Sequence, residues 1–288
     1  METKAIQRAV VSPLKTFNDA IRSEKTQMYL QDILGAKKAS FVNNITALVS
    51  NNVNLQPCDP VSLINACIKA TALDLPLDQN LGMVHVIPYK NGKTGKTDAQ
   101  LQFGYRAFIQ LAIRSGQFKT INVTDVREGE IASEDLLTGE ITLKRAANRL
   151  ELPVIGYVSY FKLTNGFEKM LYMSMEDMDA HAKRYSQTYA SKTDYIRSSS
   201  KWTTDFDAMA KKTALKLLLN RYAPLSVEMR DAVVSDQAVI SNQGDVERYP
   251  DNSEVDVQYQ EDAYKETESK TQQVMDAIKA SKTKETIF

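Results

Sequence analysis

The chain has 288 residues, 43% of them hydrophobic, with 36 basic and 36 acidic side chains that give a formal net charge of zero. This length and composition allow one sizeable hydrophobic core. The two cysteines, Cys58 and Cys67, form neither a close metal-binding pair nor a disulfide framework, and there is no signal peptide or apolar run of about 20 residues. These observations exclude disulfide-rich and membrane-spanning classes, and we expect a soluble protein of the reducing cytoplasm.

The zero net charge hides an uneven distribution along the chain. Residues 1–225 carry 29 Lys and Arg against 22 Asp and Glu, whereas residues 226–288 carry 7 against 14. The body is therefore +7 and the end −7. A basic body with an acidic end indicates a surface that binds a polyanion, and we expect the acidic end to lie outside that surface.

Residues 1–58 are predicted to form an N-terminal helical segment. Ser12 and Pro13 open an amphipathic stretch that stops at Gly35, and apolar residues at helical spacing recur between 41 and 49. Asp59 as an N-cap, with Pro60 at the first helical position, predicts a further helix that ends near residue 72. A core domain is expected to begin at this helix and to run over 59–225.

Beyond residue 83 the apolar period changes to that of strands. Residues 83–89 and 99–104 read as a hairpin joined by 90–98, and a helix over 105–115 follows, with Gly116 as its stop. Further strands are expected over 119–127, 139–144, 153–163 and 167–173, the last two joined by a turn at 164–166. The predicted class is α+β, with a β-hairpin and an antiparallel sheet packed on helices.

Two capped helices and an acidic tail are expected after the strands. Ser174 with Asp177 predicts a helix start, and Thr204 with Asp207 predicts a second helix over 208–221. Residues 226–288 are predicted to form a largely disordered acidic tail, because large aliphatic residues become few beyond Ser241. Helical spacing returns near residue 274, so the tail either carries a short motif that folds on a partner or only solubilises the protein.

Residues 181–221 combine positive charge with aromatic rings. This stretch has nine Lys and Arg against three Asp, with five aromatic residues among them. Cations hold a phosphate backbone and flat rings accept unstacked bases, so the pattern suits a groove for single-stranded nucleic acid. A solvated basic helix beside core aromatics is the alternative reading of the same stretch.

No group of residues in the sequence has the types and spacing that a known kind of catalytic site requires. Residues 92–97 resemble part of a phosphate-binding loop, but Lys90 stands where a glycine is needed and the segment joins two strands. His85 and His181 have no neighbours at metal-ligand or triad spacing. The remaining acidic cluster reads as a solvated hairpin in preference to a nuclease metal site; its members are Glu128, Glu130, Glu134 and Asp135.

Seven blocks between residues 12 and 224 agree in type and order with those of one known family. They are TALDLP (71–76), PYK (88–90), QFGYRAFIQLAIRSG (102–116), IGY (155–157), NGFE (165–168), HAKRYS (181–186) and WTTDFDAMAKK (202–212). On these blocks the chain resembles the RecT family of phage single-strand annealing proteins. No block falls in the acidic end, so the resemblance identifies no partner for that end.

The resemblance implies a protein that coats single-stranded DNA, assembles into rings or helical filaments, and pairs complementary strands without ATP. It implies an α+β core similar to that of the eukaryotic annealing recombinases. The implied partners are single-stranded DNA, the annealed duplex, further copies of the chain, a 5′ to 3′ exonuclease and a single-strand-binding protein of a bacterial host. We expect no enzymatic activity, no metal site and no cofactor, with Mg²⁺ as a candidate stimulant. A metal-dependent nuclease and a scaffolding phage protein with incidental DNA affinity are the alternatives.

Annealing requires that backbone charge be neutralised while bases stay exposed, so we expect Lys, Arg and one Gln to contact phosphates and aromatic rings to contact bases. The expected phosphate contacts are Lys90, Arg106, Gln110, Arg114, Lys183, Arg184, Lys192, Arg197, Lys201, Lys212 and Lys216. The expected base contacts are Tyr89, Tyr105, Tyr185 and Trp202. For each residue, a solvated charge or a core aromatic is the alternative. Lys211 is left out, because Asp207 precedes it by one turn and an ion pair is expected.

Overall fold

The structure, a computed structural model, describes residues 12–91, 95–135, 137–241 and 243–249 of the chain. Its helices are α1 (Pro13–Arg22), α2 (Glu24–Leu34), α3 (Lys38–Asn51), α4 (Pro60–Ala72), α5 (Tyr105–Arg114), α6 (Met175–Tyr185), α7 (Asp194–Ser198), α8 (Lys201–Thr204), α9 (Phe206–Tyr222) and α10 (Val227–Ser235). Its strands are β1 (Val84–Lys90), β2 (Thr97–Phe103), β3 (Phe118–Arg127), β4 (Ile131–Asp135), β5 (Glu140–Leu143), β6 (Val154–Leu163), β7 (Glu168–Ser174), β8 (Val239–Ile240) and β9 (Val246–Arg248). The fold is α+β with antiparallel sheets, and this confirms the predicted class.

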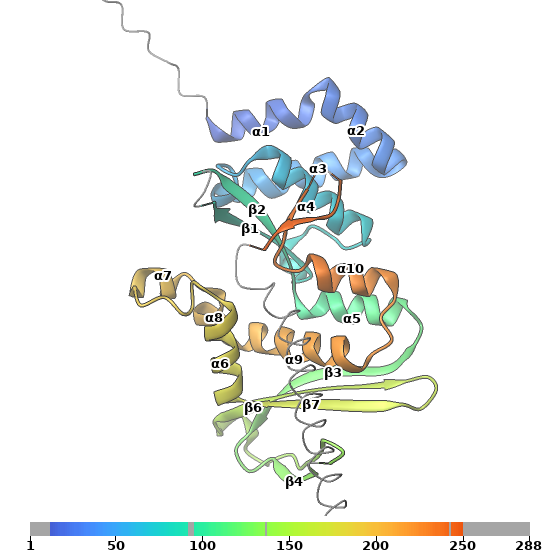
Figure 1. Ribbon diagram of the computed structural model, residues 1–288, viewed down its shortest axis with the longest axis vertical. Helices are drawn as coiled ribbons and strands as arrows, with labels where there is room; N and C mark the ends of the chain where they lie inside the picture. The colour runs from blue at the N-terminus through green and yellow to red at the C-terminus, as the bar shows by residue number, and fades with distance from the viewer. Residues whose placement is uncertain (1–11, 92–94, 136, 242, 250–288) are drawn as a thin grey trace, which may run out of the picture.

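The elements are stacked along the long axis of the molecule. Figure 1 shows α1 to α4 with the β1–β2 hairpin at one end, the β3–β6–β7 sheet at the other, and α5, α9 and α10 between them. Helix α9 packs against α5 and against all three strands of that sheet. Its buried Leu215 and Leu218 belong to one hydrophobic core that runs from Phe17 in α1 to Ile240 in β8. The N-terminal helices are therefore part of the same core as the sheet.

The helix starts follow the expected caps, with one exception. Asp59 accepts hydrogen bonds from the backbone N–H groups of Val61 (3.1 Å) and Ser62 (3.2 Å), and Ser174 accepts one from Asp177 (3.0 Å). Helix α9 begins earlier than predicted, because the Asp205 side chain accepts from the Ala208 backbone N–H (3.3 Å) and replaces the expected cap at residue 204. The short helices α7 and α8 were not predicted, because each is too short to show a period. Strand β4 pairs with β5 in the acidic hairpin that the sequence predicts there.

Residues 226–249, expected to belong to the disordered tail, are part of the folded core. Helix α10 buries Met229 and Ala232, and β8 buries Val239 and Ile240. The backbone of the segment also pairs with β2. The Gln237 N–H donates to the Leu101 carbonyl (2.8 Å), and the Leu101 N–H donates to the Ala238 carbonyl (2.9 Å). The boundary expected at residue 225 is therefore too early. The prediction of disorder for residues 250–288 falls outside the described residues.

Candidate nucleic-acid interface

Three adjoining cavities form a groove between the β1–β2 hairpin and the segment from α6 to the start of α9. The hairpin cavity, of about 500 Å³, lies between β1 and residues 186–188 and 199–202. The α5 cavity, of about 360 Å³, lies between the hairpin and the first residues of α5 and α9. The arm cavity, of about 690 Å³, lies between the end of α6 and α7–α8. Lys201 lines the first two cavities and Trp202 the first and third, so the cavities meet at α8.

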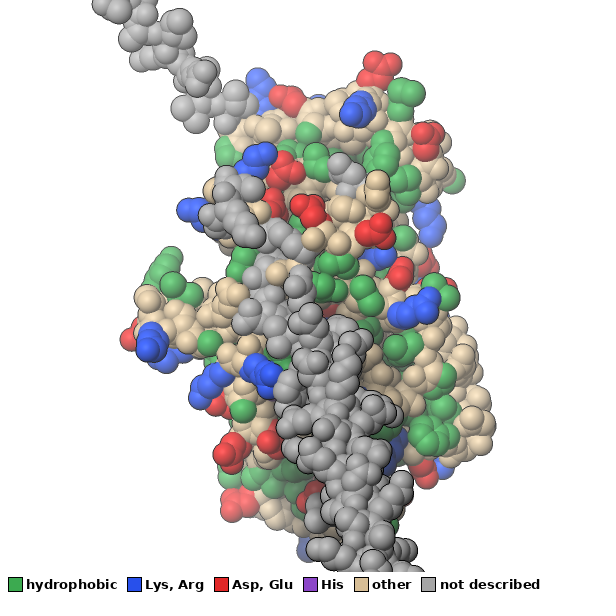
Figure 2. Space-filling view, in the orientation of Figure 1, with side chains coloured by type: hydrophobic (Ala, Val, Ile, Leu, Met, Phe, Trp, Pro, Cys, Tyr) green, Lys and Arg blue, Asp and Glu red, His purple; other side chains and the backbone are tan. Residues whose placement is uncertain are grey.

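Six of the cations predicted to contact phosphate line the groove, and five of them, all except Lys212, are exposed. Lys201 stands where the hairpin and α5 cavities meet, and Arg106 lines the α5 cavity. The arm cavity is lined by Lys183, Lys192 and Arg197. All five side chains are exposed, and Figure 2 shows Lys and Arg gathered around α7 and α8. Residues from α5 to α8 and from the loop before α7, separated by up to 95 positions in sequence (106 to 201), thus form one rim in which these cations outnumber the acidic residues Asp179, Asp205 and Asp207.

The cations of the rim are free to exchange their partners for phosphate. Lys183 pairs with Asp179 (2.6 Å) and Arg197 with Asp194 (2.7 Å), both at the surface. Such exposed pairs contribute only about 0–1 kcal/mol, so a phosphate can displace the carboxylate. Within the described residues, no ion pair joins Lys192 or Lys201 to a carboxylate. Lys211 lies in the ion pair expected for it, with Asp207 (2.6 Å).

Lys212 is placed differently from the prediction. Its side chain is 6% exposed and its Nζ lies 2.8 Å from Oδ1 of Asp236, which is 1% exposed. Lys216 reaches the other oxygen of the same carboxylate at 3.2 Å. Burial lowers the pKa of Lys212, and the Asp236 charge opposes that effect. In this arrangement Lys212 and Lys216 hold the segment after α10 on α9. We therefore correct the assignment of Lys212 from a phosphate contact to a buried ion pair. Lys216 is half-buried, and its predicted contact with phosphate stays a prediction.

Four further predicted contacts lie outside the three cavities. Arg114 donates to the carbonyls of Leu73 (2.7 Å) and Asp74 (3.1 Å), so it satisfies the backbone that follows α4 and has a structural role. Lys90 and Arg184 are exposed at the ends of β1 and α6, and Gln110 is half-buried on α5. Their predicted contact with phosphate stays a prediction.

Trp202 is a core residue in this structure. It is 5% exposed, and its ring packs against those of Tyr189 (6.2 Å between centroids) and Phe206 (5.3 Å). Tyr185 is half-buried and stacks on His181 at 4.4 Å, outside the three cavities of the groove. Tyr89 and Tyr105 are half-buried and line the hairpin and α5 cavities. Of the four aromatic residues predicted to contact bases, Tyr89, Tyr105 and Trp202 thus line the groove, and Trp202 is the one whose ring is buried.

We expect Trp202→Ala to act through stability. Removing a buried Trp side chain costs about 3–5 kcal/mol of unfolding free energy, because the transfer energy is lost and a cavity remains. Urea denaturation should show this loss, while the affinity for single-stranded DNA, measured per folded molecule, stays within about twofold of wild type. An unchanged unfolding midpoint together with lost binding would show that the ring contacts DNA directly.

Sequence reasoning missed the uncharged polar residues of the groove. Gln100 and Gln102 alternate with apolar residues along β2, and the Gln102 Nε2 donates to the Gln100 Oε1 (3.0 Å). The hydroxyls of Ser199 and Ser200 come from the run at 198–200 that precedes α8. Such residues carry neither charge nor ring, so only the alternation on β2 and the serine run could have indicated them. His85, judged a strand side chain, also lines the hairpin and α5 cavities.

One member of the acidic cluster, Glu130, is explained by an ion pair. Glu130, expected to be solvated, is buried, and its carboxylate lies 2.8 Å from Nε of Arg149. Asp125 joins the same network through Arg127 (2.8 Å) and Arg149 (3.1 Å). Burial by itself would raise the pKa of Asp125, but the two arginines hold it below its ordinary value. Among the described residues, no group of three or more His, Cys, Asp and Glu could hold a metal ion.

These features define an α+β protein with a groove whose rim carries Lys and Arg, and comparison with known proteins identifies its family. The chain belongs to the RecT family, whose model matches residues 39–274. It is 36% identical to the uncharacterized protein YqaK of Bacillus subtilis (strain 168) over 240 residues, 83% of this chain and 78% of that protein. It is 31% identical to protein RecT of Escherichia coli (strain K12) over 188 residues, 62% of this chain and 64% of that protein. In the part of the chain that the structure describes, no helix is long and apolar enough to cross a membrane.

Proposed function

We propose that this protein binds single-stranded DNA in the groove and anneals complementary strands without ATP in phage-type recombination. The observation that carries the proposal is the convergence on one groove of five exposed cations, four from different helices and one from the loop before α7. They are divided between the α5 cavity and the arm cavity, which suits a chain of phosphates better than a single anion. Membership of the RecT family, which implies single-stranded DNA binding and recombination, supports the same function.

Charge neutralisation is the step that these residues would perform. Two complementary strands repel each other until their phosphates are screened, and contacts with the backbone carry no sequence information. A strand held by Lys192, Arg197 and Lys201 would therefore keep its bases available to any partner strand. We propose that further copies of the chain extend the groove into a ring or filament, because one groove spans only a short piece of DNA.

We also propose the cellular location and the partners of this activity. We place it in the cytoplasm of a bacterial host, beside a 5′ to 3′ exonuclease that supplies the single strand. A host single-strand-binding protein is the proposed partner of the acidic end, and Mg²⁺ is a proposed stimulant. No catalytic role is assigned to the chain.

Annealing of two complementary oligonucleotides by the purified protein should proceed without nucleotide. A quenched fluorophore pair on the two strands reports the rate, and addition of ATP should leave that rate unchanged. Full-length DNA should persist in the presence of Mg²⁺ or Mn²⁺, as judged on a denaturing gel. An absolute requirement for ATP would contradict the proposal, metal-dependent loss of DNA would favour the nuclease, and weak, salt-insensitive binding would favour the scaffolding protein.

A further inference from the structure

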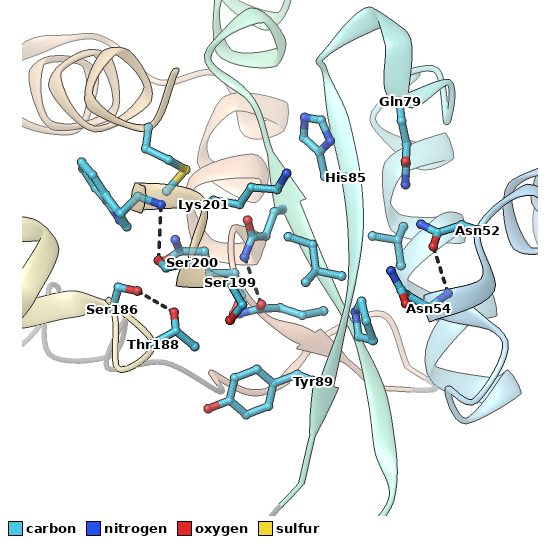
Figure 3. Close-up of a pocket in the computed structure, with 18 residues that line it drawn as sticks. Asn52, Asn54, Gln79, His85, Tyr89, Ser186, Thr188, Ser199, Ser200 and Lys201 are labelled. Carbon is cyan, nitrogen blue, oxygen red and sulfur yellow. Dashed lines mark hydrogen bonds between the residues drawn. The ribbon is translucent and has the colours of Figure 1, made fainter. Parts of the chain in front are cut away.

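The hairpin cavity differs from the rest of the groove in being polar but nearly uncharged. In the described part of the chain, Lys201 is the one Lys, Arg, Asp or Glu in its lining. Figure 3 shows a hydroxyl-bearing wall on one side of the hairpin and an amide-bearing wall on the other. The first wall has Ser186, Thr188, Ser199 and Ser200, and the second has Asn52, Asn54 and Gln79.

We propose that the hairpin cavity binds an unstacked nucleobase of the bound strand, while the cations of the α5 and arm cavities hold the phosphates around it. This rests on the proposed function and deepens it. Phosphate oxygens only accept hydrogen bonds and carry a charge that cations neutralise, whereas amides and hydroxyls both donate and accept hydrogen bonds, as the edges of bases do. A wall of such groups can match the polar edge of any of the four bases, which suits a protein that must accept every sequence.

The imidazole of His85, which lines the hairpin cavity, also favours an uncharged ligand. Burial lowers the pKa of its imidazole, and the charges of Lys212 and Lys201 lower it further, against the opposing effect of Asp205. Arg106 and Asp207 are the other charged groups that line the α5 cavity with it. The imidazole is therefore neutral at neutral pH and offers one donor and one acceptor. A base edge can use both groups, whereas a phosphate can use the donor alone.

Tyr89 provides the flat surface that an unstacked base requires. It is half-buried at the end of β1, and its hydroxyl is 3.5 Å from Oε1 of Gln187, which positions the ring beside the hydroxyl-bearing wall. Aromatic stacking is tolerant of base identity. The volume of about 500 Å³ lies in the range of pockets that hold small organic molecules, about 300–1,000 Å³.

The same cavity runs along β1, which is an edge strand, so a β-strand of another copy is the competing occupant. Pro88 lies within β1 and has no backbone N–H to donate, and this weakens the edge as a template for an added strand. Lys201, which links the cavity to the positively charged rim, is better explained by DNA. A base is therefore the occupant that the lining favours.

The test compares two fluorescent strands of equal length and equal phosphate count, one of normal nucleotides and one in which every base is absent. Each strand is tested with wild type and with three variants of the full-length protein. Tyr89→Ala removes the ring, Tyr89→Phe keeps the ring and removes only the hydroxyl, and Gln102→Leu removes an amide. The matched controls are Tyr222→Ala and Gln117→Leu, which alter an exposed Tyr and an exposed Gln outside the groove. Circular dichroism confirms that each variant is folded, and sedimentation reports its self-association.

We expect Tyr89→Ala to weaken binding of the normal strand by about fivefold or more, and Gln102→Leu by about 2- to 10-fold. Neither should change binding of the strand without bases, and Tyr89→Phe and both controls should match wild type. Equal losses on both strands, or no loss on either, would overturn the proposal. So would reduced self-association with unchanged discrimination between the strands. If wild type binds neither strand, the proposed function itself fails.

Discussion

Replacing Asp236 with alanine should lower the free energy of unfolding by about 3–5 kcal/mol, because Lys212 would remain buried without a counter-charge. The Asp236 carboxylate also accepts the Phe103 backbone N–H at 2.9 Å, and the variant leaves that buried donor unsatisfied. Urea denaturation followed by circular dichroism measures the change. Asp231→Ala is the matched control: its ion pair with Lys69 is half-exposed, so we expect a loss of about 1 kcal/mol or less.

A second variant separates charge from packing. Asp236→Asn keeps an acceptor for Phe103 but removes the charge, and adding Lys212→Met removes the uncompensated ammonium. We expect the double variant to recover at least half of the stability lost in Asp236→Asn, since a buried pair replaced as a whole is often neutral. A double variant that is less stable than either single variant would contradict this account of the pair.

The contribution of Asp236 should also depend on pH. Burial by itself would raise its pKa, but Lys212, Lys216 and the hydrogen bonds outweigh burial and lower the pKa below its ordinary value. A group with a lowered folded-state pKa stabilises the protein above the unfolded-state pKa, about 3.9 for Asp, and loses that contribution as the pH falls through the folded-state pKa. The stability difference between wild type and Asp236→Asn should therefore be constant near neutral pH and shrink below about pH 3.9.

A chain that ends at Leu225 should fail to fold, whereas a chain that ends at Tyr249 should fold and keep its ability to bind DNA. The shorter chain loses the buried residues of α10 and β8 together with Asp236. Leu-, Ile- or Met-sized core losses cost about 2–5 kcal/mol each, so their sum reaches the whole stability of a typical domain, about 5–15 kcal/mol. Soluble expression and cooperative thermal unfolding of the two chains measure the difference.

The chain that ends at Tyr249 also isolates the acidic end. It keeps every residue of the groove, so annealing in vitro should persist. Loss of like charge should if anything strengthen nonspecific DNA binding. Recombination in cells should fall if the acidic end recruits a partner. Loss of annealing in vitro would instead place residues 250–288 in the assembly or in the DNA path.

The sequence predicts most of the regular elements, because caps and apolar periods are local signals. The caps at Asp59 and Ser174 and the α+β class are all present in the structure. Whether a particular side chain is buried or exposed depends on tertiary contacts that no local sequence pattern contains. Lys212 shares a helical stripe with Lys216, yet Asp236, 24 positions away, determines that it is buried.

The basic aromatic segment illustrates the same limit. The structure has features of both readings: Lys192, Arg197 and Lys201 are exposed around the groove, while Trp202 is in the core. Composition identifies the segment but cannot tell which side chains face inward, because α7 and α8 are too short to have a readable period. The hydroxyl-bearing and amide-bearing walls of the hairpin cavity could not be predicted from the sequence for a similar reason, since their residues come from four separate parts of the chain.

The salt dependence of single-stranded DNA affinity tests the central claim most directly. Each phosphate contact on a single strand contributes about 0.7 to the slope of log affinity against log salt concentration. A variant with Lys192→Ala, Arg197→Ala and Lys201→Ala should therefore have a slope smaller by about 2. Wild type and a control variant with Lys25→Ala, Lys119→Ala and Lys144→Ala, all exposed and outside the groove, should have equal slopes. An unchanged slope in the groove variant, or an equal reduction in the control, would show that the groove is not where this protein holds DNA.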